Sequence, residues 1–196
     1  MIDIVLRGVQ PEEITLSAAE AGSAGGRRAV SVESLFREHY ARIVRMLTRL
    51  TGDGAHAEEI AADVFHKLSQ RPELLAGQDD LTAWIYRVST NAGLDGLRTN
   101  SRRRQREEAA GADVHGAAPP NALENILREE RCSRVREVLG GLKPREAQLL
   151  LLRANGLAYR ELAQTLGVEP GSVGTMLARA EAEFERKFRA RYGEQV

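Results

Sequence analysis

Residues 158–177, AYRELAQTLGVEPGSVGTML, decide the fold of the C-terminal part of this chain. Ala163, Gly167 and Val173 stand at spacings of i, i+4 and i+10. A small residue lets two helices approach, glycine makes the turn between them, and a β-branched residue locks the second helix into the core. The spacing predicts a helix-turn-helix, although an ordinary helical hairpin in a bundle gives the same pattern.

The second helix of this motif has one apolar and one polar side when it is unrolled at about 100° per residue. The predicted core stripe is Val173, Leu177, Ala180, Phe184 and Phe188, and the opposite side carries Ser172, Thr175, Arg179, Glu183 and Arg186. Two hydroxyls, a helix N-terminus and an arginine suit a phosphate. Glu183 would repel one, so we expect a DNA contact that is geometrically possible but weak.

Upstream of this motif, apolar residues recur at helical spacing and no strand-like alternation is visible. We expect helices from Ser31 to Gly52, from about Ala55 to Gln70, and from a cap at Asp79 or Asp80 to about Arg104, the third with a core stripe of Leu81, Ile85, Val88 and Ala92. The segment 107–121 is rich in Ala, Gly and Pro and is typical of a flexible linker. The prediction is an all-α protein of two small helical domains, 31–106 and 122–192, after an unassigned N-terminal arm, 1–30.

Composition excludes several classes of protein. The chain of 196 residues carries 28 Lys and Arg against 28 Asp and Glu, which counts against a free-standing DNA binder because such proteins usually carry a basic excess. Neither a signal peptide nor an apolar run of about 20 residues is present, and a single cysteine, Cys132, fits a reducing cytoplasm. No catalytic or metal-ligand motif occurs, so we expect no enzyme, cofactor or metal site.

Two charged features indicate binding surfaces. Five arginines lie within nine residues at the end of the third helix: Arg98, Arg102, Arg103, Arg104 and Arg106. Trp84, Arg87 and Asn91 share a side of that helix with Arg98 and Arg102, a combination that suits a nucleic-acid strand, although a lone Trp is more often a core residue. The second helix carries Glu58, Glu59 and Asp63, which form either a solvated acidic face or a docking face for a basic protein surface.

Three blocks, in this order, resemble the extracytoplasmic-function (ECF, group 4) sigma factors of the sigma-70 family. The segment SLFREHYARIVRMLTRLTGDGAHAEEIAADVFHKLSQRP is similar to the start of sigma domain 2. DLTAWIYRVSTNAGLDGLRTNSRRR resembles its promoter-melting helix, and LKPREAQLLLLRANGLAYRELAQTLGVEPGSVGTMLARAEAEF resembles sigma domain 4. The resemblance implies a subunit that binds core RNA polymerase, directs it to promoters and promotes melting.

The resemblance also implies roles for individual residues. Docking on core polymerase would fall to Glu58, Glu59, Asp63 and Phe65. Recognition and melting of the −10 element would fall to Trp84, Arg87, Asn91, Arg98, Arg102, Arg103 and Arg104, with a flipped base held near the loop of about Arg71–Asp80. The −35 element would meet Ser172, Thr175, Arg179 and Arg186. Expected partners are the beta and beta-prime subunits, promoter DNA and an anti-sigma factor that could hold the protein at the membrane, without a stable homo-oligomer.

Several positions depart from the family pattern. Ala62 replaces a frequent glutamine, Gly174 and Met176 stand where Lys or Arg is common, and the segment after Ala180 is acidic rather than basic. These departures concern the strength of the −35 contact. Two alternatives remain open from the sequence: a self-sufficient helix-turn-helix regulator, and an all-α interaction protein without a role on DNA.

Overall fold

The computed structural model describes residues 31–71, 74, 81–109 and 122–193, with side chains described except at 100–109 and 122–126. The N-terminal arm, most of the loop before the third helix and most of the predicted linker therefore lie outside the described residues. All regular structure in the described part is helical, which confirms the all-α prediction. No helix there is long and apolar enough to cross a membrane.

Three helices form the N-terminal bundle: α2 (Val32–Thr51), α3 (Gly54–Ser69) and α5 (Leu81–Ala109). The Ser31 hydroxyl accepts from the Ser34 backbone N–H at 3.1 Å, and Gly52 ends α2 at a φ of 76°. Ser31 and Gly52 are thus the residues that the sequence predicted to begin and end this helix. Asp53 caps α3 in the same way, accepting from the His56 N–H at 3.1 Å. The helix α5 continues to Ala109, past the predicted end near Arg104.

The C-terminal bundle consists of α6 (Ala122–Gly140), α7 (Pro144–Ala154), α8 (Tyr159–Leu166), a 3-10 turn η1 (Pro170–Ser172) and α9 (Val173–Tyr192). Pro144 occupies the first turn of α7, where its missing N–H costs nothing. The turn between α8 and α9 places Gly167 in the left-handed region at a φ of 63°. Ala163 and Val173 are buried beside it, so the predicted helix-turn-helix is present.

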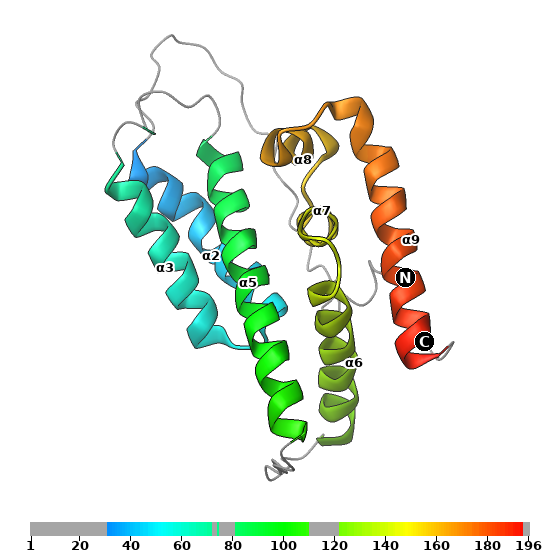
Figure 1. Ribbon diagram of the computed structural model, residues 1–196. Coiled ribbons are helices and arrows are strands. Elements are labelled where there is room, and N and C mark those ends of the chain that lie inside the picture. The colour runs from blue at the N-terminus through cyan, green and yellow to red at the C-terminus, as the bar shows by residue number, and fades with distance from the viewer. Residues whose placement is uncertain (1–30, 72–73, 75–80, 110–121, 194–196) are drawn as a thin grey trace.

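The two bundles lie against each other along α5. Figure 1 shows α3 on the outer side of one bundle and α9 on the outer side of the other, with α5 beside α6, α7 and α8. One continuous apolar core runs through both bundles, from Leu47 in α2 to Leu94 in α5 and Leu150 in α7. This direct contact between the bundles was not predicted from the sequence.

The contact explains why the predicted core stripe of α5 is incomplete. Leu81 and Ile85 are buried as expected, whereas Val88 and Ala92 are only half-buried. A second, unpredicted side of the helix is buried as well, by Ala83, Tyr86, Thr90, Leu94 and Leu97. Because α5 packs on α2 and α3 on one side and on the C-terminal bundle on the other, a single stripe does not describe it.

Candidate nucleic-acid and polymerase interfaces

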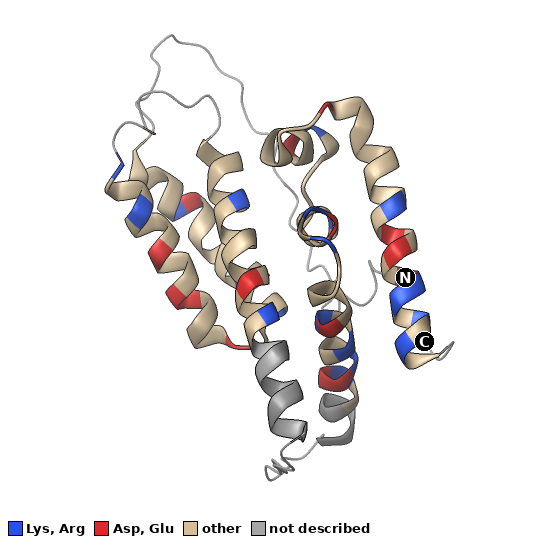
Figure 2. Cartoon of the chain, viewed as in Figure 1, with Lys and Arg blue, Asp and Glu red and all other residues tan. Residues whose placement is uncertain are grey.

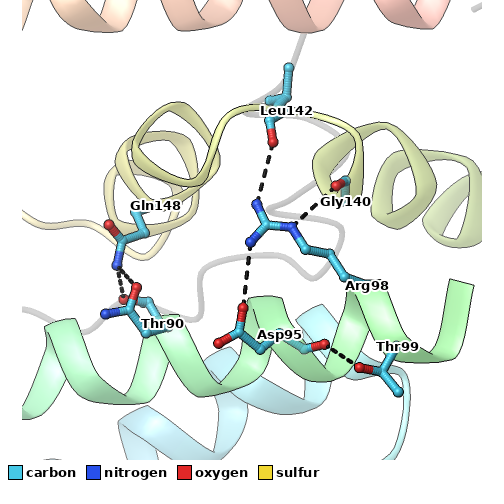
Figure 3. Close-up of polar contacts among 8 residues, drawn as sticks. Thr90, Asp95, Arg98, Thr99, Gly140, Leu142 and Gln148 are labelled. Carbon is cyan, nitrogen blue, oxygen red and sulfur yellow. Dashed lines mark hydrogen bonds and ion pairs between the residues drawn. The ribbon is translucent and has the colours of Figure 1, made fainter. Parts of the chain in front are cut away.

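Arg98 is the best-defined cation on the predicted melting helix, and it points at the C-terminal bundle. Its Nε donates to the Gly140 carbonyl at 3.4 Å and its Nη2 to the Leu142 carbonyl at 3.3 Å. The Asp95 carboxylate accepts from Nη1 at 3.5 Å (Figure 3). The guanidinium thus sits at the C-terminal end of α6, where carbonyl groups without helical partners favour a cation.

Asn91, one of the predicted base-contacting residues, meets a glutamine that the sequence did not single out. Gln148 of α7 is 7 % exposed, and its Nε2 donates to Asn91 Oδ1 at 2.6 Å and to Thr90 Oγ1 at 3.3 Å (Figure 3). Thr90 in turn donates to the Tyr86 carbonyl at 2.8 Å. A buried amide needs such partners, so this side of α5 is matched to α7.

The remaining residues of the predicted melting surface differ in their surroundings. Trp84 is half-buried and packs against the core, whereas Arg87 is exposed. The side chains of Arg102, Arg103, Arg104 and Arg106 lie outside the described residues. The half-burial of Trp84 fits both interpretations of it, as a core residue and as a stacking platform. The structure thus brings Asn91 and Arg98 to one side of α5 and leaves the role of the arginine cluster a prediction.

The first turn of α9 presents the polar residues that the sequence placed there. Ser172, Thr175 and Arg179 are exposed, while Val173, Leu177, Ala180 and Phe184 are buried. Phe188, predicted in the core stripe, is half-buried and stacks on Phe184 with ring centroids 5.9 Å apart. An exposed N-terminal turn with hydroxyls and one cation is a suitable surface for a DNA backbone.

Glu183 and Arg186, expected to act separately on this surface, form a two-bond ion pair. Arg186 donates to the two carboxylate oxygens at 2.8 and 2.7 Å, and Lys187 lies 3.9 Å from one of them. The hydrogen bond from Arg186 lowers the pKa of Glu183 from its ordinary value. The carboxylate therefore does not stand alone against a phosphate, and Arg186 is not a free cation. The candidate DNA-contacting surface at the start of α9 therefore consists of Ser172, Thr175 and Arg179.

Acidic residues follow the outward side of α3, away from the C-terminal bundle. Glu58, Glu59 and Asp63 are all exposed (Figure 2), and His56 Nδ1 lies 3.4 Å from Glu59 Oε2. No cluster of three or more metal-ligating side chains occurs among the residues that the structure describes. The acidic face is therefore available to a basic protein surface.

Phe65 requires a correction, because its side chain is 4 % exposed and belongs to the core rather than to the docking surface. The exposed aromatic residue at this position is Phe36 of α2, which its helical spacing places among the apolar residues of that helix and which is nevertheless 44 % exposed. Its ring stacks on Tyr40 at 4.3 Å between centroids and meets Phe65 edge-on at 5.1 Å.

Comparisons with known proteins agree with this architecture. Residues 35–103 match the family model of sigma-70 region 2, and residues 132–184 match that of sigma-70 region 4. The chain is 31 % identical over 168 residues to the ferric citrate uptake sigma factor FecI of Escherichia coli, covering 84 % of this chain and 94 % of FecI. It is 28 % identical over 179 residues to the ECF RNA polymerase sigma factor SigE of Mycolicibacterium smegmatis, covering 87 % of this chain and 67 % of SigE.

Among solved structures, the chain is similar to the sigma factor RpoE of Bartonella quintana, crystallised with the anti-sigma factor NepR. The TM-score is 0.47 at 16 % identity, over 80 % of this chain and 96 % of that one. Sigma-70 regions 2 and 4, which follow each other in this order along the chain, define a promoter-specificity subunit of bacterial RNA polymerase. The chain belongs to the extracytoplasmic-function sigma factors of the sigma-70 family.

Proposed function

We propose that this sigma factor uses α3 to dock on core polymerase, α5 to recognise and melt the −10 element, and the first turn of α9 to contact the −35 element. The proposal rests on one observation: acidic side chains and side chains suited to nucleic acid lie on different helices of the chain. Exposed carboxylates gather on α3, while base-contacting and cationic side chains lie on α5 and α9. A docking face and two nucleic-acid faces are what a promoter-directing subunit requires.

The individual roles follow from the surroundings of each side chain. Glu58, Glu59 and Asp63 form the docking face, with Phe36 in the place first given to Phe65. Asn91 supplies an amide that can bond a splayed base, and Arg98 a cation for the backbone. Ser172, Thr175 and Arg179 face the −35 element. An anti-sigma partner, a cytoplasmic location and the absence of catalysis and of a stable homo-oligomer are parts of the same proposal.

In vitro transcription with core polymerase tests the proposal. Run-off transcription on a genomic library, with start sites mapped, should give discrete starts that share −10 and −35 elements. In a defined template, replacing Arg98, Arg102, Arg103 and Arg104 by alanine should abolish open-complex formation measured by permanganate footprinting. Arg131→Ala, on the exposed side of α6, is the matched control and should leave it unchanged.

Two other results would replace the proposal. A self-sufficient regulator would bind a specific duplex without core polymerase and would fail to pull core polymerase down. An all-α interaction protein would support no transcription, and the four arginine replacements would change no activity. The acidic face on α3 favours the sigma factor, because a self-sufficient regulator has no use for it.

A further inference from the structure

We propose that α9 selects the −35 element by the 5-methyl groups of thymine, which the side chains of Thr175 and Ala178 contact in the major groove. The proposal rests on the proposed function, because α9 must be the helix that enters the groove. It goes further by naming the chemical group of DNA that is read and the side chains that read it. In this arrangement Arg179 holds a phosphate and does not distinguish bases.

Burial shows which side of α9 faces away from the core. Four residues define the inward side of the helix: Val173, Leu177, Ala180 and Phe184. Directly opposite lies Thr175, with Ala178 turned about 60° to one side of it and Arg179 about 40° to the other, at about 100° per residue. All three are exposed. Figure 1 shows α9 on the outer side of the C-terminal bundle, so this face is open to a large partner.

The first two turns of this face offer methyl groups and few hydrogen-bonding groups. Bidentate hydrogen bonds to base edges come from arginine, lysine, asparagine and glutamine, and carboxylates accept from cytosine. None of these residue types occurs from residue 173 to residue 178, and Arg179 is the first along the helix. Thr175 presents one methyl group and one hydroxyl, and Ala178 presents one methyl group. The chemistry that remains for base recognition is therefore mainly apolar.

Thymine is the base whose major-groove edge offers an apolar group. Its C5 methyl group projects into the groove, whereas the other three bases present hydrogen-bonding groups there. Alanine and the methyl group of threonine are among the side chains that contact it. Because Thr175 and Ala178 are three residues apart, they are neighbours on the surface of the helix and can contact neighbouring base pairs.

The residues beside Thr175 leave its side chain open to the groove. Gly174 has no side chain, and the nearest atom to the position of an added Cβ belongs to the Tyr159 ring, at 3.8 Å. Met176 is half-buried and packs against the core. A long side chain at either position would hold the helix away from the base edges. The small side chains at this point therefore let α9 approach the bases to contact distance.

Arg179 lies on the same side of this face as Ser172. Both are exposed, and they are only about 20° apart around the helix. A hydroxyl and a guanidinium beside the start of a helix suit a phosphate. Phosphate contacts fix the position of a protein on the duplex without reading its sequence. Ser172 and Arg179 therefore hold α9 in register, while the methyl groups of Thr175 and Ala178 distinguish the bases.

Replacing thymine by uracil tests the proposal, because uracil lacks the methyl group and pairs with adenine in the same way. The complex of the full chain with core polymerase is measured by competition gel shift on a mapped promoter duplex, at one salt concentration. Each thymine of the −35 element, on either strand, is replaced in turn. Uracil at two neighbouring base pairs should weaken binding by roughly fourfold each, the effect of losing one buried methyl group.

Variants of the protein assign each methyl contact to a side chain. Thr175→Ser removes the methyl group and keeps the hydroxyl, and should bind the thymine and uracil duplexes equally at one of the two positions. Thr175→Val keeps a methyl group and loses the hydroxyl, and should retain the preference for thymine. Ala178→Gly should lose the preference at the other position. Ala190→Gly, exposed near the end of the same helix, controls for the low helix propensity of glycine and should keep both preferences.

The outcomes separate this proposal from the proposed function. Equal binding of the thymine duplex and every uracil duplex overturns the proposal, while a scrambled −35 element that weakens binding still supports α9 as a promoter contact. A uracil effect that Thr175→Ser and Ala178→Gly both leave unchanged overturns the assignment to these side chains. A scrambled −35 element that binds as well as the mapped one overturns the proposed function of α9 instead.

A modified cytosine provides the converse measurement. 5-Methylcytosine carries a methyl group at the same place in the groove, on a pair whose hydrogen-bonding groups differ from those of thymine and adenine. At the position assigned to Thr175, a 5-methylcytosine–guanine pair should bind the wild-type complex roughly fourfold more tightly than a cytosine–guanine pair. Thr175→Ser should bind both equally. Equal binding of the two pairs by the wild type would show that hydrogen-bonding groups are read, and would overturn the proposal.

Discussion

At the scale of single residues, the structure shows that several charged side chains are already bound to other groups of the protein. Arg98 is committed to carbonyls of the C-terminal bundle, and Arg186 is committed to Glu183. Neither partner is visible in a sequence, because one lies 42 residues away along the chain and the other depends on side-chain rotamers. Counting cations on a helix therefore overestimates how many can reach DNA.

Arg179 and Arg186 are expected to differ in their effect on transcription. Arg179→Ala should lower transcription from a promoter with a −35 element by roughly tenfold or more, because a hydrogen bond to a charged group such as a phosphate contributes about 1.5–3 kcal/mol. Arg186→Ala should change it by less than about twofold, since the guanidinium is held by Glu183. Quantitative run-off assays at limiting sigma factor measure both. Equal losses would show that the ion pair opens on DNA.

His39 makes the folded protein sensitive to acid. Its ring is buried, lies 5.9 Å from the Tyr86 ring and has Thr82 Oγ1 at 3.4 Å, with Glu38 and Arg42 nearby. Burial lowers the pKa of His39 below its ordinary value of 6.5. The unfolded chain then binds the proton more readily, so stability is fully present above about pH 6.5 and decreases as the pH falls through the folded-state pKa.

The expected measurement is a thermal unfolding series between pH 5 and pH 8. The Tm of the wild type should fall more steeply below about pH 6.5 than that of His39→Gln, which carries no ionisable group at this position. His56→Gln, which replaces a half-exposed ring near the start of α3, is the control and should follow the wild type. Parallel curves for the wild type and His39→Gln would contradict the argument.

At the scale of elements, the sequence predicted where helices begin and end better than it predicted which of their sides are buried and against which partner. Ser31, Gly52 and Gly167 are local signals, and each marks a helix end in the structure. The second buried side of α5 was missed because its partner comes from α7, far along the chain, and periodicity describes one helix at a time. Gln148 was missed for the same reason, since a lone glutamine in a leucine-rich helix gives no indication of its partner.

The turn of the helix-turn-helix should depend on Gly167 for its backbone conformation and not for its space. Its φ is 63°, and no atom lies within 4 Å of the position of an added Cβ. Gly167→Ala should therefore lower the free energy of unfolding by about 1–2 kcal/mol, the cost of the left-handed region. Gly171→Ala, with open space around it and no positive φ, should stay within about 0.5 kcal/mol of the wild type. Urea unfolding measures both.

Replacing Phe36 and Phe65 separately tests which of the two rings serves the docking face and which serves the core. Phe65→Ala removes a core ring and should lower the free energy of unfolding by about 3–5 kcal/mol. Phe36→Ala should be much better tolerated in the fold, yet weaken binding to core polymerase by about tenfold or more, because exposed aromatic rings often dominate protein interfaces. Urea unfolding and fluorescence anisotropy with core polymerase separate the effects. Unchanged polymerase affinity of Phe36→Ala would remove this residue from the docking face.

At the scale of the whole molecule, the balance of charges fits a subunit that depends on the polymerase to reach DNA. The chain has 28 basic and 28 acidic residues, so it lacks the general attraction to DNA of a free-standing regulator. This charge balance makes the polymerase the component that brings this protein to a promoter.

Promoter binding should therefore require core polymerase. In a gel-shift assay, the isolated chain should give no specific complex with a mapped promoter at concentrations where its complex with core polymerase binds fully. The matched control is the same duplex with both promoter elements scrambled, which the complex should bind much more weakly. Tight and specific binding by the isolated chain would contradict this prediction.

The ion pair between Glu183 and Arg186 has a consequence for how α9 responds to ionic strength. Each phosphate that a protein neutralises on duplex DNA releases about 0.9 of a condensed counterion, and the number released sets the salt dependence of binding. With Arg186 already neutralised, the exposed face of α9 offers Arg179 to a phosphate beside its hydroxyls. The contribution of α9 to promoter binding should therefore have the salt dependence of about one phosphate contact, a slope near −0.9 in log K against log salt concentration, rather than that of two.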